Sequence, residues 1–211
     1  MQPEQDLLIA CSRTKFTALD KAYIQELLAK KLDWTSIINN ANYHKVVALL
    51  YTVLSTTFKD HVPSFALEQL REHNNKASLY TFIINVSLLK VVSLLNENNI
   101  SVLPVKGGLL AEKLYGSAAI RLYTDVDILV HDYEIVKTLK LLQENEYTLL
   151  PEGISQKTFL KFLQHYHHGR LLDSNGVLIE LHSELSGFYA SKPLTLKEIE
   201  PFLKARSYKN I

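Results

Sequence analysis

The segment 102–130 constrains the fold of this chain most, because it combines a glycine turn with a strand that carries two carboxylates. An apolar run at 101–105 leads into the Lys-Gly-Gly turn at 106–108, and a short helical stretch follows at 109–115. The segment then ends at 125–130 in Asp-Val-Asp-Ile-Leu-Val. We therefore expect the order strand, turn, helix, loop, strand.

Side chains alternate between the two faces of a strand, so the two carboxylates of the strand at 125–130 lie on the same face. Successive side chains point to opposite faces, so Asp125 and Asp127 share one face while the apolar residues of 126–130 pack on a core. Two neighbouring carboxylates repel each other unless a cation lies between them. Mg²⁺ is usually held by one or two carboxylates plus substrate phosphates. We expect both residues to be metal ligands, and the alternative is a pair of surface carboxylates.

The glycine turn has the properties of a phosphate site. Gly107 and Gly108 allow the backbone to approach a ligand closely, and they open a helix whose N-terminal N–H groups favour an anion. Lys106 and Arg121 are candidates for neutralising charge on a phosphate that is being transferred. The alternatives are an ordinary strand-to-helix turn and an Arg121 that pairs with a nearby acid. Taken with the aspartate pair, the turn indicates nucleotide chemistry.

These motifs resemble the polymerase β-type nucleotidyltransferase superfamily. They are similar in particular to a branch of uncharacterised bacterial nucleotidyltransferases with a Leu-Lys-Gly motif, a Tyr, an Arg, an Asp-x-Asp strand and a later acid before Leu-His. The matching residues are Val105-Lys106-Gly107, Tyr115, Arg121, Asp125-Val126-Asp127 and Glu180-Leu181-His182. The resemblance covers about residues 30 to 185.

The resemblance implies an enzyme that moves a nucleoside monophosphate from a nucleoside triphosphate to an acceptor and releases pyrophosphate. Asp125, Asp127 and Glu180 would hold Mg²⁺ or Mn²⁺, and Glu180 would also help to deprotonate an acceptor hydroxyl. Alternation within 177–182 places Glu180 and His182 on one face, so a strand beside the aspartates would bring both to the site. We expect His182 to face the substrate. The alternative is a surface glutamate on an outer strand.

Two other classes of function stay open on the same fold. One is a nucleotide-binding or regulatory module without turnover, and the other is an interaction protein whose helical half docks a partner. A zinc site is a third reading, since His165 and His168 are three positions apart and His167 and His182 lie nearby. No Cys or His-Glu-x-x-His pattern supports zinc. The Asn-Gly turn at 175–176 predicts a hairpin of 170–173 and 177–182, and we favour a substrate-facing histidine near it.

The pattern of the chain changes near residue 98. Residues 4–98 hold helical spacings with no glycine and one proline, whereas short strands and helices alternate from Ile100 onward. We predict an α+β protein with a helical domain at 1–98 and a nucleotidyltransferase-like α/β domain with a small mixed sheet at 99–190. A C-terminal helix and tail would occupy 191–211.

The composition of the chain limits which classes of molecule it is expected to bind. The net charge of +1 offers no basic track for nucleic acid, which argues against templated synthesis, and gives no general attraction to anionic membranes. A single cysteine, Cys11, excludes an intrachain disulfide. No signal peptide and no apolar run of membrane-spanning length is found, so we expect a cytoplasmic protein. Its partners would be a nucleoside triphosphate and an acceptor that is a small molecule, a peptide or a protein.

Overall fold

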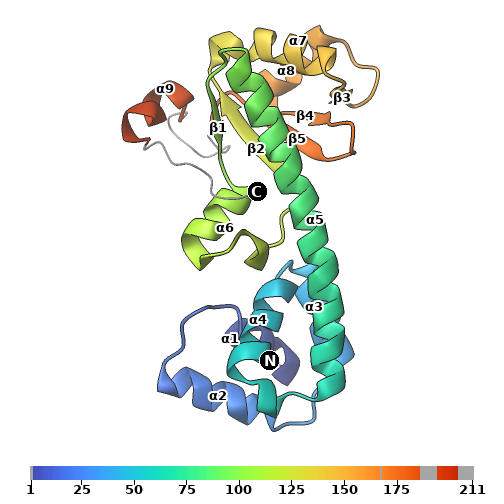
Figure 1. Ribbon diagram of the computed structural model, residues 1–211, viewed down its shortest axis with the longest axis vertical. Helices are drawn as coiled ribbons and strands as arrows, with labels where there is room; N and C mark the ends of the chain where they lie inside the picture. Colours follow the sequence, from blue (N-terminus) through green and yellow to red (C-terminus); the bar gives the residue numbers. More distant parts are fainter. Residues whose placement is uncertain (1, 167, 186–193, 204–211) are drawn as a thin grey trace. The chain divides into compact units, whose positions relative to one another are not determined.

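A computed structural model describes residues 2–166, 168–185 and 194–203 (Figure 1). The fold is α+β, with many helices and one small mixed sheet of five strands, as the sequence predicted. The chain divides into two compact units. The first comprises Met1–Phe82 and Leu110–Tyr123, and the second comprises Ile83–Leu109 and Thr124–Ile211.

The first unit is helical. Its elements are α1 (Pro3–Ala10), α2 (Ala18–Leu28), α3 (Trp34–Tyr43), α4 (Val47–Thr57), the 3₁₀ turns η1 (Lys59–His61) and η2 (Ala118–Ile120), the first part of α5 (Ser64–Glu97) and most of α6 (Gly107–Tyr115). Side-chain caps start two of these helices: Thr17 and Asp20 form a capping box at α2, and Asp33 accepts from the Ser36 amide at α3. The apolar faces of the helices meet in one core that includes Leu7, Ile24, Ile37, Leu50, Leu54 and Phe58.

Helix α5 runs unbroken from Ser64 to Glu97, and its residues belong to both units. Its first part buries Ala66 and Leu70, and its last part buries Ile84, Val91 and Leu95. Among the described residues, α5 is the helix that is long and apolar enough to cross a membrane. Less than half of its most apolar 18-residue stretch is buried in the protein. Length and composition alone do not identify a membrane span, because the core helices of soluble proteins meet the same criteria. The absence of a membrane span therefore stays a prediction.

The second unit is built on the sheet. Its elements are β1 (Val102–Pro104), β2 (Asp125–Val130), η3 (Asp132–Glu134), α7 (Ile135–Glu144), β3 (Thr148–Leu150), α8 (Gln156–Tyr166), β4 (His168–Leu172), β5 (Leu178–His182), α9 (Leu196–Ile199) and η4 (Glu200–Phe202). The strand order is β1-β2-β5-β4-β3. β2 and β5 are parallel, and the other neighbouring pairs are antiparallel.

One face of the sheet is apolar and the other is polar, as alternation requires. Val126, Ile128, Ile179, Leu181 and Leu171 are buried on the apolar face. α7 and α8 bury their own apolar stripes, which include Leu139, Leu142, Phe159 and Leu163. The opposite face carries the acidic and basic side chains of β2, β5 and β4, so the candidate site lies on that face.

Most predicted element positions hold within one or two residues. The strand predicted at 125–130 is confirmed as β2, and the predicted Asn-Gly turn joins β4 to β5. Helix α7 begins at Ile135, because residues 132–134 form the separate 3₁₀ turn η3 before it. In the predicted C-terminal segment, α9 is short, since Pro201 lies in a 3₁₀ turn directly after it. Much of the predicted segment 191–211 lies outside the described residues.

Candidate functional site

Parallel pairing of β2 and β5 brings three potential metal ligands together. Asp127 is the Cα partner of Glu180, and Leu129 is the partner of His182, so the polar side chains of both strands project from one face. One ligand atom from each of Asp127, Glu180 and His182 lies within 4.8 Å of the others. Two carboxylates and an imidazole, brought from two strands, thus form a compact donor set.

Asp127 is the buried member of this set. Its side chain is 4% exposed, and its Oδ1 lies 2.6 Å from Nζ of Lys106 and 3.0 Å from Nε2 of His182. Burial by itself would raise the pKa of Asp127, but hydrogen bonds from His182 and Lys106, with their positive charge, lower that pKa below its ordinary value. The carboxylate is therefore held in its ionised form, as a metal ligand must be.

Glu180 is surrounded by basic side chains from β4 and β5. Nε of Arg170 lies 3.2 Å from Oε1 of Glu180, and Nε2 of His168 lies 3.9 Å from the same oxygen. Nε2 of His182 lies 3.8 Å from Oε2. Register accounts for these contacts, because β4 pairs Arg170 with Glu180 and His168 with His182. Cations thus balance both carboxylates of the cluster.

The donor set fits a divalent cation. Carboxylate oxygens suit Mg²⁺ and Mn²⁺, while the imidazole nitrogen adds preference for a transition metal. Nε2 of His182 has to be free of its proton to bind a metal, and that same atom contacts Asp127. A cation at this position would therefore replace the His182 and Lys106 contacts to Oδ1 of Asp127.

The Lys-Gly-Gly turn lies beside Asp127. The Val105 amide donates to the Asp127 carbonyl at 3.1 Å, which joins the turn to β2. Lys106 then reaches the Asp127 side chain, and Gly107 opens α6 with a φ of 56°, a conformation that glycine adopts without strain. Gly107 and Gly108 thus start a helix next to the carboxylate cluster. Their role as a phosphate cradle stays a prediction.

Asp125 and Arg121 occupy different surroundings. Asp125 lies on the same face of β2 two residues before Asp127, half-buried, and outside the three-residue cluster. Arg121 belongs to the helical unit, where it lines a hollow of about 220 Å³ with Tyr115 and with Lys45. The predicted roles of Asp125 in metal binding and of Arg121 in phosphate binding are still predictions.

The other acids and histidines near Glu180 in the sequence lie in other places. Asp173 accepts a hydrogen bond from the Ser87 hydroxyl in α5, and Glu184 lies in an isolated bridge with Thr195. His165 belongs to α8, so it does not share a helix with His168 in β4, and His167 lies outside the described residues. The residues that sequence reasoning missed are Arg170 and His168 as partners of Glu180. Only the register between β4 and β5 identifies them, and that register is known once the two strands of the hairpin are aligned.

The chain was compared with known proteins. A family model described as an uncharacterised nucleotidyltransferase matches residues 30–208. No curated protein and no solved structure matches the chain. The matched region contains the whole carboxylate cluster and the Lys-Gly-Gly turn.

Proposed function

This chain belongs to the uncharacterised nucleotidyltransferase family, and on that premise we propose that it transfers a nucleoside monophosphate from a nucleoside triphosphate to an acceptor hydroxyl. The observation that carries the proposal is the register that pairs Asp127 with Glu180 and gathers both around His182. Carboxylates from neighbouring strands can share a divalent cation that also binds a triphosphate.

The proposed reaction has a simple balance. The acceptor oxygen forms a new bond to the α-phosphorus, the bond from that phosphorus to the bridging oxygen breaks, and pyrophosphate leaves with the electron pair. The proton of the acceptor hydroxyl passes to the Glu180 carboxylate, which Arg170 holds in position at 3.2 Å. The reaction is mostly a matter of positioning and of charge stabilisation.

The residues of the site divide these tasks. Asp127, Glu180 and His182 would hold Mg²⁺ or Mn²⁺, with Asp125 as a further carboxylate on the same face of β2. When bound, the cation supplies charge stabilisation for the triphosphate and the developing acceptor oxyanion. Lys106, released from Asp127, would then be available to a phosphate oxygen. Gly107 and Gly108 would present backbone N–H groups to the same phosphates.

Thermal unfolding with each of the four nucleoside triphosphates, with and without Mg²⁺ or Mn²⁺, tests the proposal. A ligand at about 100 times its Kd adds roughly 2.7 kcal/mol to the free energy of unfolding, which is visible as a higher midpoint. We expect a metal-dependent shift in the wild type that is lost in the Asp125→Asn, Asp127→Asn double variant. Asp60→Asn, which removes an exposed carboxylate from the helical unit, is the matched control.

Pyrophosphate release then separates catalysis from binding. We expect release with a suitable acceptor, a large loss in Glu180→Gln, and no loss in Asp60→Asn. Full transfer activity in Asp127→Asn would remove Asp127 from the proposed mechanism. No metal-dependent shift with any triphosphate would contradict the nucleotide site itself.

The second candidate is a nucleotide-binding module without turnover. It is favoured by the cations that already neutralise the cluster, because Lys106 contacts Asp127 and Arg170 contacts Glu180 where an active site would need both carboxylates for metal. Nucleotide binding that needs no divalent cation, and that survives Glu180→Gln, would support this candidate over the transferase.

A further inference from the structure

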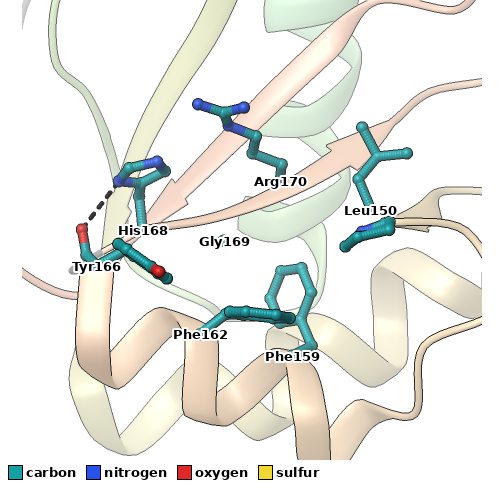
Figure 2. A pocket seen from close by; sticks show the side chains of 8 residues that line it. Leu150, Phe159, Phe162, Tyr166, His168, Gly169 and Arg170 are labelled. Carbon is teal, nitrogen blue, oxygen red and sulfur yellow. Dashed lines mark hydrogen bonds between the residues drawn. The ribbon is translucent and has the colours of Figure 1, made fainter.

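A hollow of about 540 Å³ opens in the second unit (Figure 2). Its walls come from the end of β3, from α8 and from β4, and the lining residues are Leu150, Pro151, Phe159, Phe162, Tyr166, His168, Gly169 and Arg170. The volume is that of a typical small-molecule site, and the walls are mostly aromatic and aliphatic. The hollow is therefore suited to an apolar group.

The hollow exists because β3 stops early. Leu150, the last residue of β3, pairs with Arg170, and the chain then turns away at Pro151. β4 continues past this pair through Gly169 to His168. The edge of β4 beyond β3 forms one wall, and α8 forms the other.

Gly169 and Phe159 shape the floor of the hollow. Phe159 is fully buried, and a β-carbon at Gly169 would overlap its ring. Only glycine at this position leaves room for the tip of the ring against the strand. Figure 2 shows Phe159 and Phe162 on the side of Gly169 that faces α8, with the guanidinium of Arg170 pointing away from them.

Two large aromatic side chains are left exposed at the rim. Phe162 is 38% exposed and Tyr166 is 48% exposed, and their rings stack with centroids 6.1 Å apart at 30°. Aromatic rings attract a further ring in offset-stacked or edge-to-face geometry. The side chains of Leu150, Pro151, Phe159 and Phe162 form the apolar part of the lining and carry no polar group. A plain aromatic ring can be buried against this apolar part without leaving a hydrogen-bonding group unpaired.

The hollow and the proposed site share two residues of β4. His168 and Arg170 line it, and both contact Glu180, the residue proposed to take the acceptor proton. His168 is held in place by the Tyr166 carbonyl, 3.0 Å from its Nδ1. We propose that this hollow receives an aromatic ring of the acceptor, so that the acceptors are hydroxyl compounds carrying an aromatic group. This inference rests on the proposed transferase function.

The test uses phenyl alcohols of increasing chain length as probes, with straight-chain alcohols of equal length as controls. Binding to the full chain is titrated by ligand-observed NMR in the presence of Mg²⁺ and a nucleoside triphosphate. We expect the phenyl alcohols to bind more tightly, and Phe162→Ala to weaken them roughly tenfold through lost stacking and burial. Phe202→Ala, which truncates a phenylalanine that is 82% exposed in η4, should have no effect.

The outcomes separate the two proposals. Equal binding of phenyl and straight-chain alcohols, or equal effects of Phe162→Ala and Phe202→Ala, would overturn the ring pocket while metal-dependent triphosphate binding persists. Weaker triphosphate binding in Phe162→Ala, at an unchanged unfolding midpoint without ligand, would assign the hollow to the base and overturn its assignment to the acceptor. Tyr166→Ala repeats the test if Phe162→Ala fails to fold. Absence of triphosphate binding in the wild type would instead contradict the proposed function.

Discussion

Nε2 of His182 lies 3.0 Å from Oδ1 of Asp127, although the two residues are 55 positions apart in the chain. The contact joins the end of β5 to the middle of β2, and it places an imidazole beside a buried, ionised carboxylate. Both atoms are potential metal ligands, so the contact marks the position where a cation would compete with a proton.

The imidazole predicts a preference among divalent cations. Nitrogen ligands suit Mn²⁺ better than Mg²⁺, so we expect His182→Gln to weaken Mn²⁺ binding roughly tenfold or more and Mg²⁺ binding less. Electron paramagnetic resonance measures free Mn²⁺ directly, and competition gives the Mg²⁺ affinity. His131→Gln is the control, because His131 is also buried but pairs with Glu200. Equal losses for both metals would remove His182 from the ligand set.

The lowered pKa of Asp127 predicts sensitivity to acid in the metal-free protein. A carboxyl whose pKa is depressed on folding stabilises the native state above its ordinary value of 3.8, and that stability is lost as pH falls through the folded pKa. We expect the difference in free energy of unfolding between wild type and Asp127→Asn to shrink below about pH 4. Urea unfolding from pH 7 to pH 3 measures it. A difference that grows as pH falls would contradict the direction of the shift.

The buried hydrogen bond between Ser87 and Asp173 anchors α5 to the β4–β5 hairpin. Oδ1 of Asp173 also accepts from the amides of Asn175 and Val177, at 2.8 Å each. Asp173→Ala should lower the free energy of unfolding by about 3 kcal/mol, and Ser87→Ala by about 1 to 2 kcal/mol, because each leaves buried polar groups unpaired. Urea unfolding of both single variants and the double variant gives the coupling.

Ser101→Ala, which truncates an exposed serine, is the control for that series. Additive losses in the double variant would mean that Ser87 and Asp173 do not act as a pair.

Replacement of Gly169 should be costly because of Phe159. The added methyl group of Gly169→Ala would overlap the ring, and overpacking of this kind costs about 1 to 3 kcal/mol. Phe159→Leu removes the ring that the added methyl group would overlap. We therefore expect the double variant to lose less free energy of unfolding than the sum of the losses in the two single variants. Thermal and urea unfolding measure both. Simple additivity would show that the ring does not limit residue 169.

Cys11 should be chemically inert in the folded protein. The thiol is 1% exposed, and burial raises its pKa to about 12, with a smaller opposing effect from Arg13. A thiol reagent should therefore react only as fast as the protein unfolds. A pKa raised on folding stabilises the native state below about pH 9, and this stability is lost as pH rises towards 12. Cys11→Ala should lack that alkaline component, and rapid labelling of native protein would contradict the burial.

The site illustrates how far local sequence reasoning reaches. Alternation alone located β2 at its observed bounds, and the Asn-Gly turn located the β4–β5 hairpin. The spacing of Glu180 and His182 placed both on one face of their strand. Arg170 carries no such signal, because nothing near it in the chain indicates which residue of a neighbouring strand it will face.

By itself, the sequence determined the elements whose signals are short-range, since side-chain alternation, capping residues and glycine turns act over a few residues. Only the tertiary structure decided that β5 lies beside β2 in parallel, that Asp127 meets Glu180 in register, and that Lys106 and Arg170 neutralise them. It also decided that α5 is a single helix and that β3 ends early enough to leave a hollow beside β4. The physical reason is that strand order and register depend on packing between segments far apart in the chain, which no local pattern records.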